Sequence, residues 1–288
     1  MPTLGIPIIV LLSLGAAVLA MVGFAAVRKF SKPIDLVEHQ TFLDAMCNIV
    51  GTLVSILLGL LVASALDTYQ SLERTIDVEA DAVAQVFRFS RGLPDPLQGE
   101  MQTLCEQYCD EIIRVEWPSL AKGVPSRKTF ITFTEITDDV VRFKPADNGQ
   151  TNLQASLLQA IQQIGDCRRT RVLALSNRRN EILMPLLAIC AITVMLFTYL
   201  YVKHVSTLQA VLIACVAVVL GGNISLVYLL SKPFEGDWRL QPRGFELTLR
   251  TLREVYGNHL YEPPPGTVLN PQTLMLMRDP NAKREPSK

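Results

Sequence analysis

Five residues of one otherwise apolar segment have the size and polarity to meet water inside a membrane. They are Asn48, Thr52, Ser55, Gly59 and Val62. Their spacing of three and four places them along one strip of an α-helix, and polar groups inside a membrane must face partners or water. If several copies of the chain bring this strip together around an axis, it would line a narrow pore, with Leu58 and Leu66 as candidate constrictions.

The same segment carries a second pattern, in which small residues recur at every fourth position. Gly51, Ser55, Gly59 and Ala63 form a stripe of the kind that lets two membrane helices approach closely. Packing of helices, within the fold or between copies of the chain, explains this stripe without any pore. From the residues alone, packing is the stronger interpretation and pore lining is the sharper alternative.

Acidic residues gather just beyond this segment. They are Asp67, Glu73, Asp77, Glu79 and Asp81. A solvated helix face explains them as well as a function does. If the face instead turned towards the axis of an oligomer, it would form an acidic vestibule that favours cations. The vestibule candidates are Asp67, Arg74, Asp77 and Asp81.

Arginines gather before the third apolar segment. They are Arg168, Arg169, Arg171, Arg178 and Arg179. Snorkelling side chains that contact lipid phosphates explain this group, and a ring that attracts anions is the alternative. Because the acidic and basic groups favour ions of opposite charge, the sequence leaves the ion undecided.

Residue patterns that support catalysis or metal binding are missing from the sequence. It has no Gly-rich phosphate-binding loop and no nucleophile elbow. Cys105 and Cys109 lie one helical turn apart, but His39, His204 and His259 lack ligand spacing, so we expect buried thiols. The 27 basic and 27 acidic residues give no basic excess for binding nucleic acid. We therefore expect no enzyme, no cofactor, no bound metal and no nucleic-acid partner.

Four apolar segments are long enough to hold these residues in a membrane. Charged residues make up only 19% of the chain and avoid these segments, and a bilayer core requires about 20 apolar residues per helix. The predicted spans are 4–27, 45–66, 182–202 and 208–230. The expected fold class is an all-α membrane protein with four transmembrane helices, surrounded by membrane lipids.

The spans divide the chain into five predicted parts. A first transmembrane pair covers 4–66, a helical region 67–181 and a second pair 182–230, followed by a turn and helix at 231–257 and a disordered tail at 258–288. The basic residues near the spans are more numerous on the side that holds both termini and residues 67–181, so we expect these parts in the cytoplasm of a multi-pass cell-membrane protein. Arg28 and Lys29 after the first span point the other way.

The helical region shows a continuous apolar stripe. Apolar residues step by three and four from Tyr69 to Phe87. Because no Gly or Pro lies between Leu60 and Arg91, we expect the second span to leave the membrane as one helix from Asp44 to Arg91. Further helices are predicted near 96–117 (broken at Trp117–Pro118), 127–143, from 151 onward and 242–256.

Several short motifs resemble the bestrophin-like family of membrane proteins, a domain of unknown function. The matching stretches are Leu66–Tyr69, Glu79–Val83, Arg91–Pro94, Glu116–Pro118 and Lys232–Gly236, the last followed by Trp238. The likeness covers most of residues 45–256. The positions that it marks as structural are Gly51, Asp67, Glu79, Glu116, Trp117, Pro118, Pro233, Phe234 and Gly236.

The resemblance implies a four-span fold with a cytoplasmic helical region and the behaviour of bestrophins proper. These are homo-oligomeric ion channels in which the second helix lines the pore. The expected function is therefore an oligomeric channel for inorganic ions, for which a pentamer is a candidate assembly. The second span lacks the aromatic residues of a bestrophin pore neck, and no acidic calcium-binding cluster follows Lys232. A non-conducting scaffold or signalling protein whose cytoplasmic helices bind a partner is the alternative.

Overall fold

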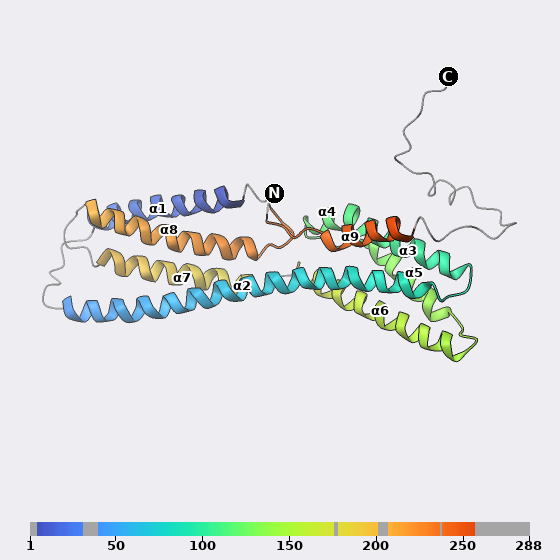
Figure 1. Cartoon of the computed structure of the whole chain (residues 1–288). Helices are drawn as coiled ribbons and strands as arrows, with labels where there is room; N and C mark the ends of the chain where they lie inside the picture. Colours follow the sequence, from blue (N-terminus) through green and yellow to red (C-terminus); the bar gives the residue numbers. More distant parts are fainter. Residues whose placement is uncertain (1–4, 31–39, 176–177, 201–206, 237, 257–288) are drawn as a thin grey trace, which may run out of the picture.

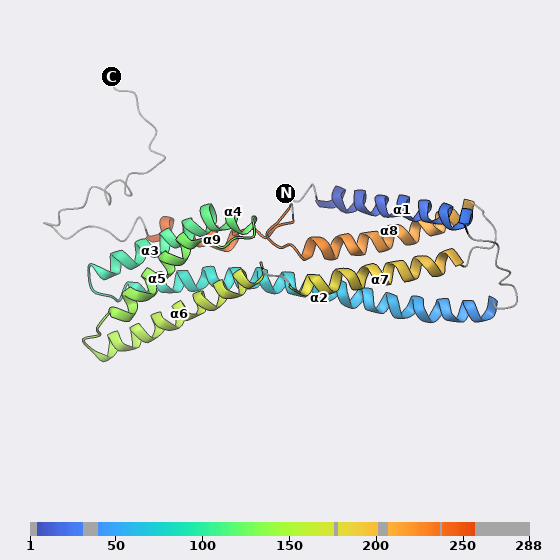
Figure 2. The same cartoon turned by 180° about the vertical axis from the view of Figure 1, so that it is seen from behind.

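The computed structural model describes residues 5–30, 40–175, 178–200, 207–236 and 238–256, and these are helical apart from short turns. Figures 1 and 2 show an elongated molecule with two ends. One end holds α1 (Gly5–Phe30), the first half of α2 (Gln40–Ser90), α7 (Arg178–Leu200) and α8 (Thr207–Leu230). The other end holds the remaining elements, α3 (Leu97–Glu111), η2 (Ile112–Glu116), α4 (Trp117–Leu120), α5 (Arg127–Arg142), α6 (Asn148–Leu173), α9 (Arg243–Thr251) and η3 (Leu252–Tyr256).

Helix α2 joins the two ends without a break. Its 51 residues span roughly 75 Å at 1.5 Å per residue. The apolar stripe from Leu72 to Phe87 is buried, and the helix ends just before Gly92. The predicted single helix is therefore confirmed, and the predicted boundary between residues 66 and 67 falls inside it.

Three helices are long and apolar enough to cross a membrane. Their apolar stretches are Ile9–Ala26, Thr207–Leu230 and the part of α2 that begins at Ala45. The corresponding stretch of α7, Met184–Tyr199, is shorter. The all-α fold with apolar helices is confirmed, and the count of four spans stays a prediction.

Helices α1 and α8 pack closely because of a glycine in α8. A Cβ at Gly221 would lie 2.6 Å from the Cβ of Ala16 and 3.3 Å from the Cα of Ser13. Helix α7 is held against α1 by Tyr199, whose hydroxyl donates a hydrogen bond to the Ala20 carbonyl at 2.7 Å. Small residues thus bring these helices together, as is common in membrane proteins.

The remaining helices pack on one side and both flanks of the second half of α2. The Ser126 hydroxyl caps α5 and the Asp147 carboxylate caps α6, each accepting a backbone N–H three residues on. The predicted break at Trp117–Pro118 is wrong, because the helix runs on through a π-helical turn to Leu120. Pro118 lies in the first turn of α4, where its missing N–H does little harm.

One predicted helix boundary differs from the structure, and one predicted segment lies outside the described residues. Helix α6 ends at Leu173 and α7 begins at Arg178, so the described residues do not form one continuous helix there. The predicted disordered tail, 258–288, lies outside the described residues.

The Gly221 contact predicts the effect of a small substitution. Replacing Gly221 with alanine should destabilise the purified protein by about 1–3 kcal/mol, since the added methyl group overlaps Ala16. Thermal unfolding in detergent measures this. Gly15→Ala is the matched control, because a Cβ at Gly15 meets no atom within 4 Å; equal losses for both variants would contradict the packing account.

Candidate functional site

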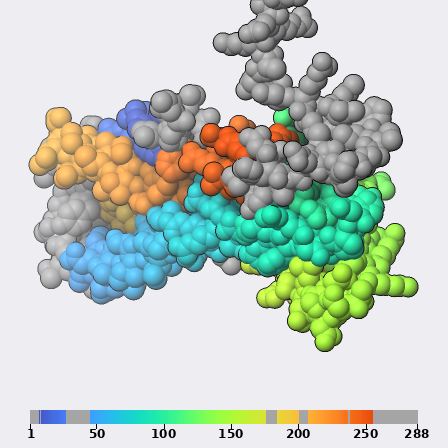
Figure 3. Space-filling model, turned by 45° about the vertical axis from the view of Figure 1, so that its right-hand side comes forward, coloured from blue at the N-terminus to red at the C-terminus, as the bar shows by residue number. Residues whose placement is uncertain are grey.

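The polar strip, made of Asn48, Thr52, Ser55, Gly59 and Val62, lies on the uncovered side of α2. The first four residues are exposed and Val62 is half-buried, and α2 is visible along one face of the molecule (Figure 3). The Thr52 hydroxyl donates to the Asn48 carbonyl at 2.8 Å. This side of α2 is therefore available to lipid, to water or to another copy of the chain.

The structure also bears on the small-residue stripe and on the two leucines predicted as pore constrictions. A Cβ at Gly51 or Gly59 would meet no atom within 4 Å, so close packing within the described chain does not explain the small-residue stripe. Leu58 is buried in one apolar cluster with Leu187 and Leu220 of its own chain. Its prediction as a pore constriction is therefore wrong, whereas Leu66 is exposed and stays a candidate.

The vestibule candidates continue along the uncovered side of α2 into the soluble half. Asp67, Arg74, Asp77 and Asp81 are all exposed. Asp77 lies beside the start of α9, since its Oδ1 would be 2.7 Å from a Cβ at Gly244. Glu79 does not belong to this face. It is fully buried, so its prediction as part of a solvated acidic face is wrong.

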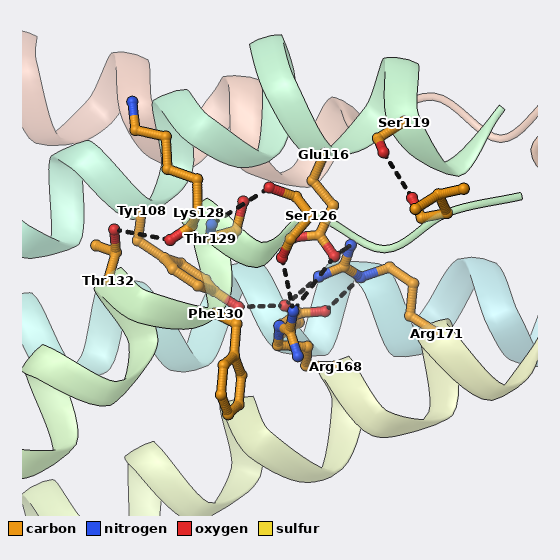
Figure 4. Close-up of polar contacts among 12 residues, drawn as sticks. Tyr108, Glu116, Ser119, Ser126, Lys128, Thr129, Phe130, Thr132, Arg168 and Arg171 are labelled. Carbon is orange, nitrogen blue, oxygen red and sulfur yellow. Dashed lines mark hydrogen bonds and ion pairs between the residues drawn. The ribbon is translucent and has the colours of Figure 1, made fainter. Parts of the chain in front are cut away.

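Glu79 belongs to a buried ion cluster with Tyr108, Glu116, Arg168 and Arg171. Figure 4 labels the last four of these residues. The Arg171 guanidinium donates to both Glu79 oxygens, at 3.0 and 2.9 Å. The Tyr108 hydroxyl donates to Glu79 Oε1 at 2.8 Å. Such a bidentate pair fixes both the distance and the orientation of its partners, so α6 and α3 are held on α2 at one register.

Glu116 brings a second carboxylate to the same guanidinium. Its Oε1 lies 3.2 Å from Arg171 Nη1 and 3.8 Å from Arg168 Nη2. The π-helical turn of η2 carries Glu116, and its carboxylate is fully buried without a hydrogen bond from any residue that the structure describes. The two arginines therefore balance the charge of two buried carboxylates.

Burial and neighbouring charge act on the titration of this cluster. Burial raises the pKa of Tyr108, and the negative charge of Glu79 raises it further. Burial alone would lower the pKa of Arg171, but Glu79 and Glu116 outweigh it and raise the pKa. Tyr108 therefore stays neutral and Arg171 stays charged at neutral pH.

The turn after α8 closes the cluster from the other side. The Trp117 ring lies over the Arg171 guanidinium at 5.7 Å and contacts the Phe234 ring edge-on at 5.8 Å. The Trp117 indole donates to the Leu240 carbonyl at 2.8 Å. The turn itself requires Gly236, whose φ is +71°. Residues far apart in the sequence thus meet at one level of α2.

The residues that meet at this level of α2 lie within a stretch of the sequence that matches one protein family. Residues 14–245 match the model of the bestrophin-like domain, which is more than half of the chain. This chain belongs to the bestrophin-like family. The predicted resemblance is therefore confirmed. Among curated proteins, none matches the sequence.

Solved structures with the bestrophin-like fold resemble this chain along nearly its whole length. A variant of a bacterial bestrophin homologue from Klebsiella pneumoniae is 11% identical, with a TM-score of 0.60 over 87% of this chain and 98% of that one. A second variant of that homologue is 13% identical, with a TM-score of 0.59 over 88% and 98%. A crystal structure described as a membrane protein is 12% identical, with a TM-score of 0.62 over the same shares. At these identities the likeness shows the fold.

Several residues that the sequence resemblance singled out as structural lie close together in the fold. Glu79, Glu116, Trp117 and Phe234 meet in or beside the buried ion cluster. Pro233 is buried and its carbonyl accepts the Leu240 N–H at 2.7 Å. Gly51, Asp67 and Pro118 lie elsewhere and take no part in the cluster.

The two functions predicted for the arginines before the third apolar segment require correction. Arg171 is fully buried, and the Arg168 side chain is only 13% exposed. Glu79, which pairs with Arg171, lies roughly 18 Å along α2 beyond Asp67. Arg168 pairs with the buried Glu116 of the same cluster, so both guanidinium groups are turned into the protein and not towards lipid. For these two arginines, lipid contact and an anion-attracting ring are both wrong, whereas Arg169 is exposed. The side chains of Arg178 and Arg179 are not among those that the structure describes.

The buried thiols are confirmed. Cys105 and Cys109 are fully buried, and burial raises the pKa of both. Within the described residues, no group of His, Cys, Asp and Glu side chains could hold a metal ion.

Removal of the central guanidinium tests the cluster. Arg171→Met should lower the free energy of unfolding by about 3–5 kcal/mol, because it leaves two carboxylates buried without their partner. Denaturant unfolding in detergent, followed by tryptophan fluorescence, measures the loss. Arg142→Met is the control, since this side chain at the end of α5 is 78% exposed, and its effect should be small. A difference near zero between the two variants would show that the cluster does not stabilise the fold.

Proposed function

We propose that this bestrophin-like chain assembles into a homo-oligomeric ion channel in the cell membrane, with α2 lining the pore. The observation that carries the proposal is the uncovered polar strip on a helix that runs from the apolar end into the soluble end. Polar side chains inside a membrane must meet partners or water. Copies of α2 around an axis would provide that water, and a pentamer is one assembly that fits this proposal.

The proposed membrane topology has four spans. Helix α7 has 23 residues, or roughly 35 Å, so its length suffices to cross even though its apolar stretch is short. With the basic residues concentrated on the side of the soluble helices, both termini and residues 67–181 would lie in the cytoplasm.

Cations are the ions that we propose for this channel. The fully buried Arg171 and nearly buried Arg168 are neutralised by Glu79 and Glu116, so they offer little charge to a permeating anion. On the uncovered side of α2, acidic Asp67 and Asp81 remain exposed. A vestibule with acidic walls concentrates cations at its mouth.

A bulky residue in the polar strip should block conduction. Ser55→Leu should lower single-channel conductance in reconstituted bilayers, or abolish it, while the native mass of the assembly stays unchanged. Ser64→Leu places the same change at an exposed position on the opposite side of α2 and should conduct as the parent does. If both variants conduct normally, α2 does not line the pore. If the parent is silent across salts and voltages, the non-conducting scaffold replaces the channel.

Neutralising the acidic residues should weaken cation preference. The double variant Asp67→Asn and Asp81→Asn should shift the reversal potential in a KCl gradient towards zero, because the vestibule loses negative charge. The shift should shrink at high salt, where exposed charges are screened. Asp138→Asn, an exposed change on α5, serves as the control. An unchanged reversal potential in the double variant would contradict the acidic vestibule.

A further inference from the structure

A groove of about 520 Å³ lies between α5 and α6. Its walls are mostly apolar and include Phe130, Leu158, Ile161 and Val172. Phe130 is 51% exposed and Leu158 37% exposed, so part of the apolar wall is open to solvent. Such an apolar groove with a charged edge is typical of a protein contact surface.

The edge of this α5–α6 groove carries charged side chains of both signs, Asp166, Arg168 and Arg169. Arg168 lies over the Phe130 ring at 5.1 Å, and Arg169 lies beside it on α6. The Arg169 side chain is 75% exposed, and its ion pair with Asp166 is long, at 4.0 Å. An acidic side chain from outside the protomer could therefore pair with Arg169 at the surface.

A complementary projection lies on α9. Leu247 is 67% exposed, while Phe245 and Leu249 of the same helix are buried in the core. The neighbouring Glu246 is exposed and has no ion pair with any residue that the structure describes. Leu247 and the neighbouring Glu246 carboxylate are therefore complementary, in polarity and in charge, to the apolar groove and the neighbouring Arg169.

Leu247 on α9 and the α5–α6 groove lie at the same height along α2, on different sides of the protomer. The Tyr108 ring contacts Phe245 of α9 at 6.5 Å and Phe133 of α5, a groove residue, at 6.4 Å. On α2, Glu79 pairs with α6 through Arg171, and the Cβ of the next residue, Ala80, would lie 3.3 Å from a Cβ at Gly244 of α9. Consecutive helical residues point about 100° apart, so α6 and α9 flank α2 on two different sides.

This arrangement fits a ring of identical copies. Arg74 and Asp81 are exposed, whereas Ile76 and Val83 are buried, so the uncovered face of α2 lies opposite the core and between the two flanks. If the uncovered face points to an axis, each protomer presents its α9 to one neighbour and its α6 to the other. A contact between two different surfaces that repeats by rotation closes into a ring.

We propose that Leu247 of one protomer inserts into the α5–α6 groove of the next protomer, with Glu246 paired to Arg169. This inference rests on the proposed homo-oligomer and names its contact in the soluble region. It also accounts for the exposed apolar side chains on both surfaces, which become buried in the ring.

Cysteine crosslinking tests the contact. In the full chain, Leu247→Cys together with Leu158→Cys should react with a short bismaleimide to give a ladder of covalent species beyond the dimer, because each protomer carries both surfaces. Leu247→Cys with Val141→Cys, an exposed position on α5 outside the groove, should give no ladder. The single variants correct for the six native cysteines. A product that stops at the dimer, or no product, would overturn the proposal.

Charge reversal gives a second test that needs no cysteine. Glu246→Arg and Arg169→Glu should each weaken assembly roughly three- to tenfold on dilution, and the two changes together should restore it. The native mass of the unsubstituted protein distinguishes a failure of this contact from a failure of the homo-oligomeric channel proposal. An oligomer without a ladder and without charge rescue contradicts this contact and leaves the channel proposal standing, whereas a monomeric parent contradicts both.

Discussion

The soluble half of this protein depends on the neutralisation of one buried positive charge. Arg171 is fully buried, and a guanidinium cannot lose its proton there, because Glu79 and Glu116 raise its pKa. The fold must therefore bring both carboxylates to it, one from α2 and one from η2. A buried charge without a partner costs several kcal/mol, so α6 cannot slide or rotate on α2 without a large loss of stability.

That constraint determines which side of α2 stays uncovered. With α6 and α9 fixed on its two flanks and the apolar stripe turned to the core, the remaining face carries Asp67, Arg74 and Asp81. The same helix continues into the apolar end, where its uncovered side carries the polar strip. Because no break interrupts α2, the orientation set in the soluble half is transmitted to the apolar half. The proposed pore strip and the proposed vestibule are thus both carried by exposed parts of one helix.

Much of the fold could be predicted from the sequence, because periodic patterns report local structure. The uninterrupted apolar stripe of α2 and the turn residues that end it predicted a single long helix. Sequence motifs also single out Glu79, Glu116 and Trp117. Pro118 was misread because a proline harms a helix only beyond its first turn, and the π-helical turn that places it there has no clear sequence pattern.

The partners in the buried ion cluster could not be predicted in the same way. Arg171 lies 92 positions from Glu79, and Tyr108 lies 29 positions away, so no local pattern connects them. One signal was present: Arg171 continues the buried face of α6 after Ile164 and Cys167, where an unpaired charge would be too costly. Leu58 was misassigned for a similar reason, since the packing of α7 and α8 against α2 decides which leucines face inward.

The central claim is that copies of α2 surround a water-filled axis. A cryo-EM structure of the purified, lipid-reconstituted assembly tests it most directly. The account predicts a ring of protomers with Asn48, Thr52 and Ser55 facing an open passage along the axis. A monomeric particle, or a ring whose centre is filled by lipid or by packed side chains, would contradict it.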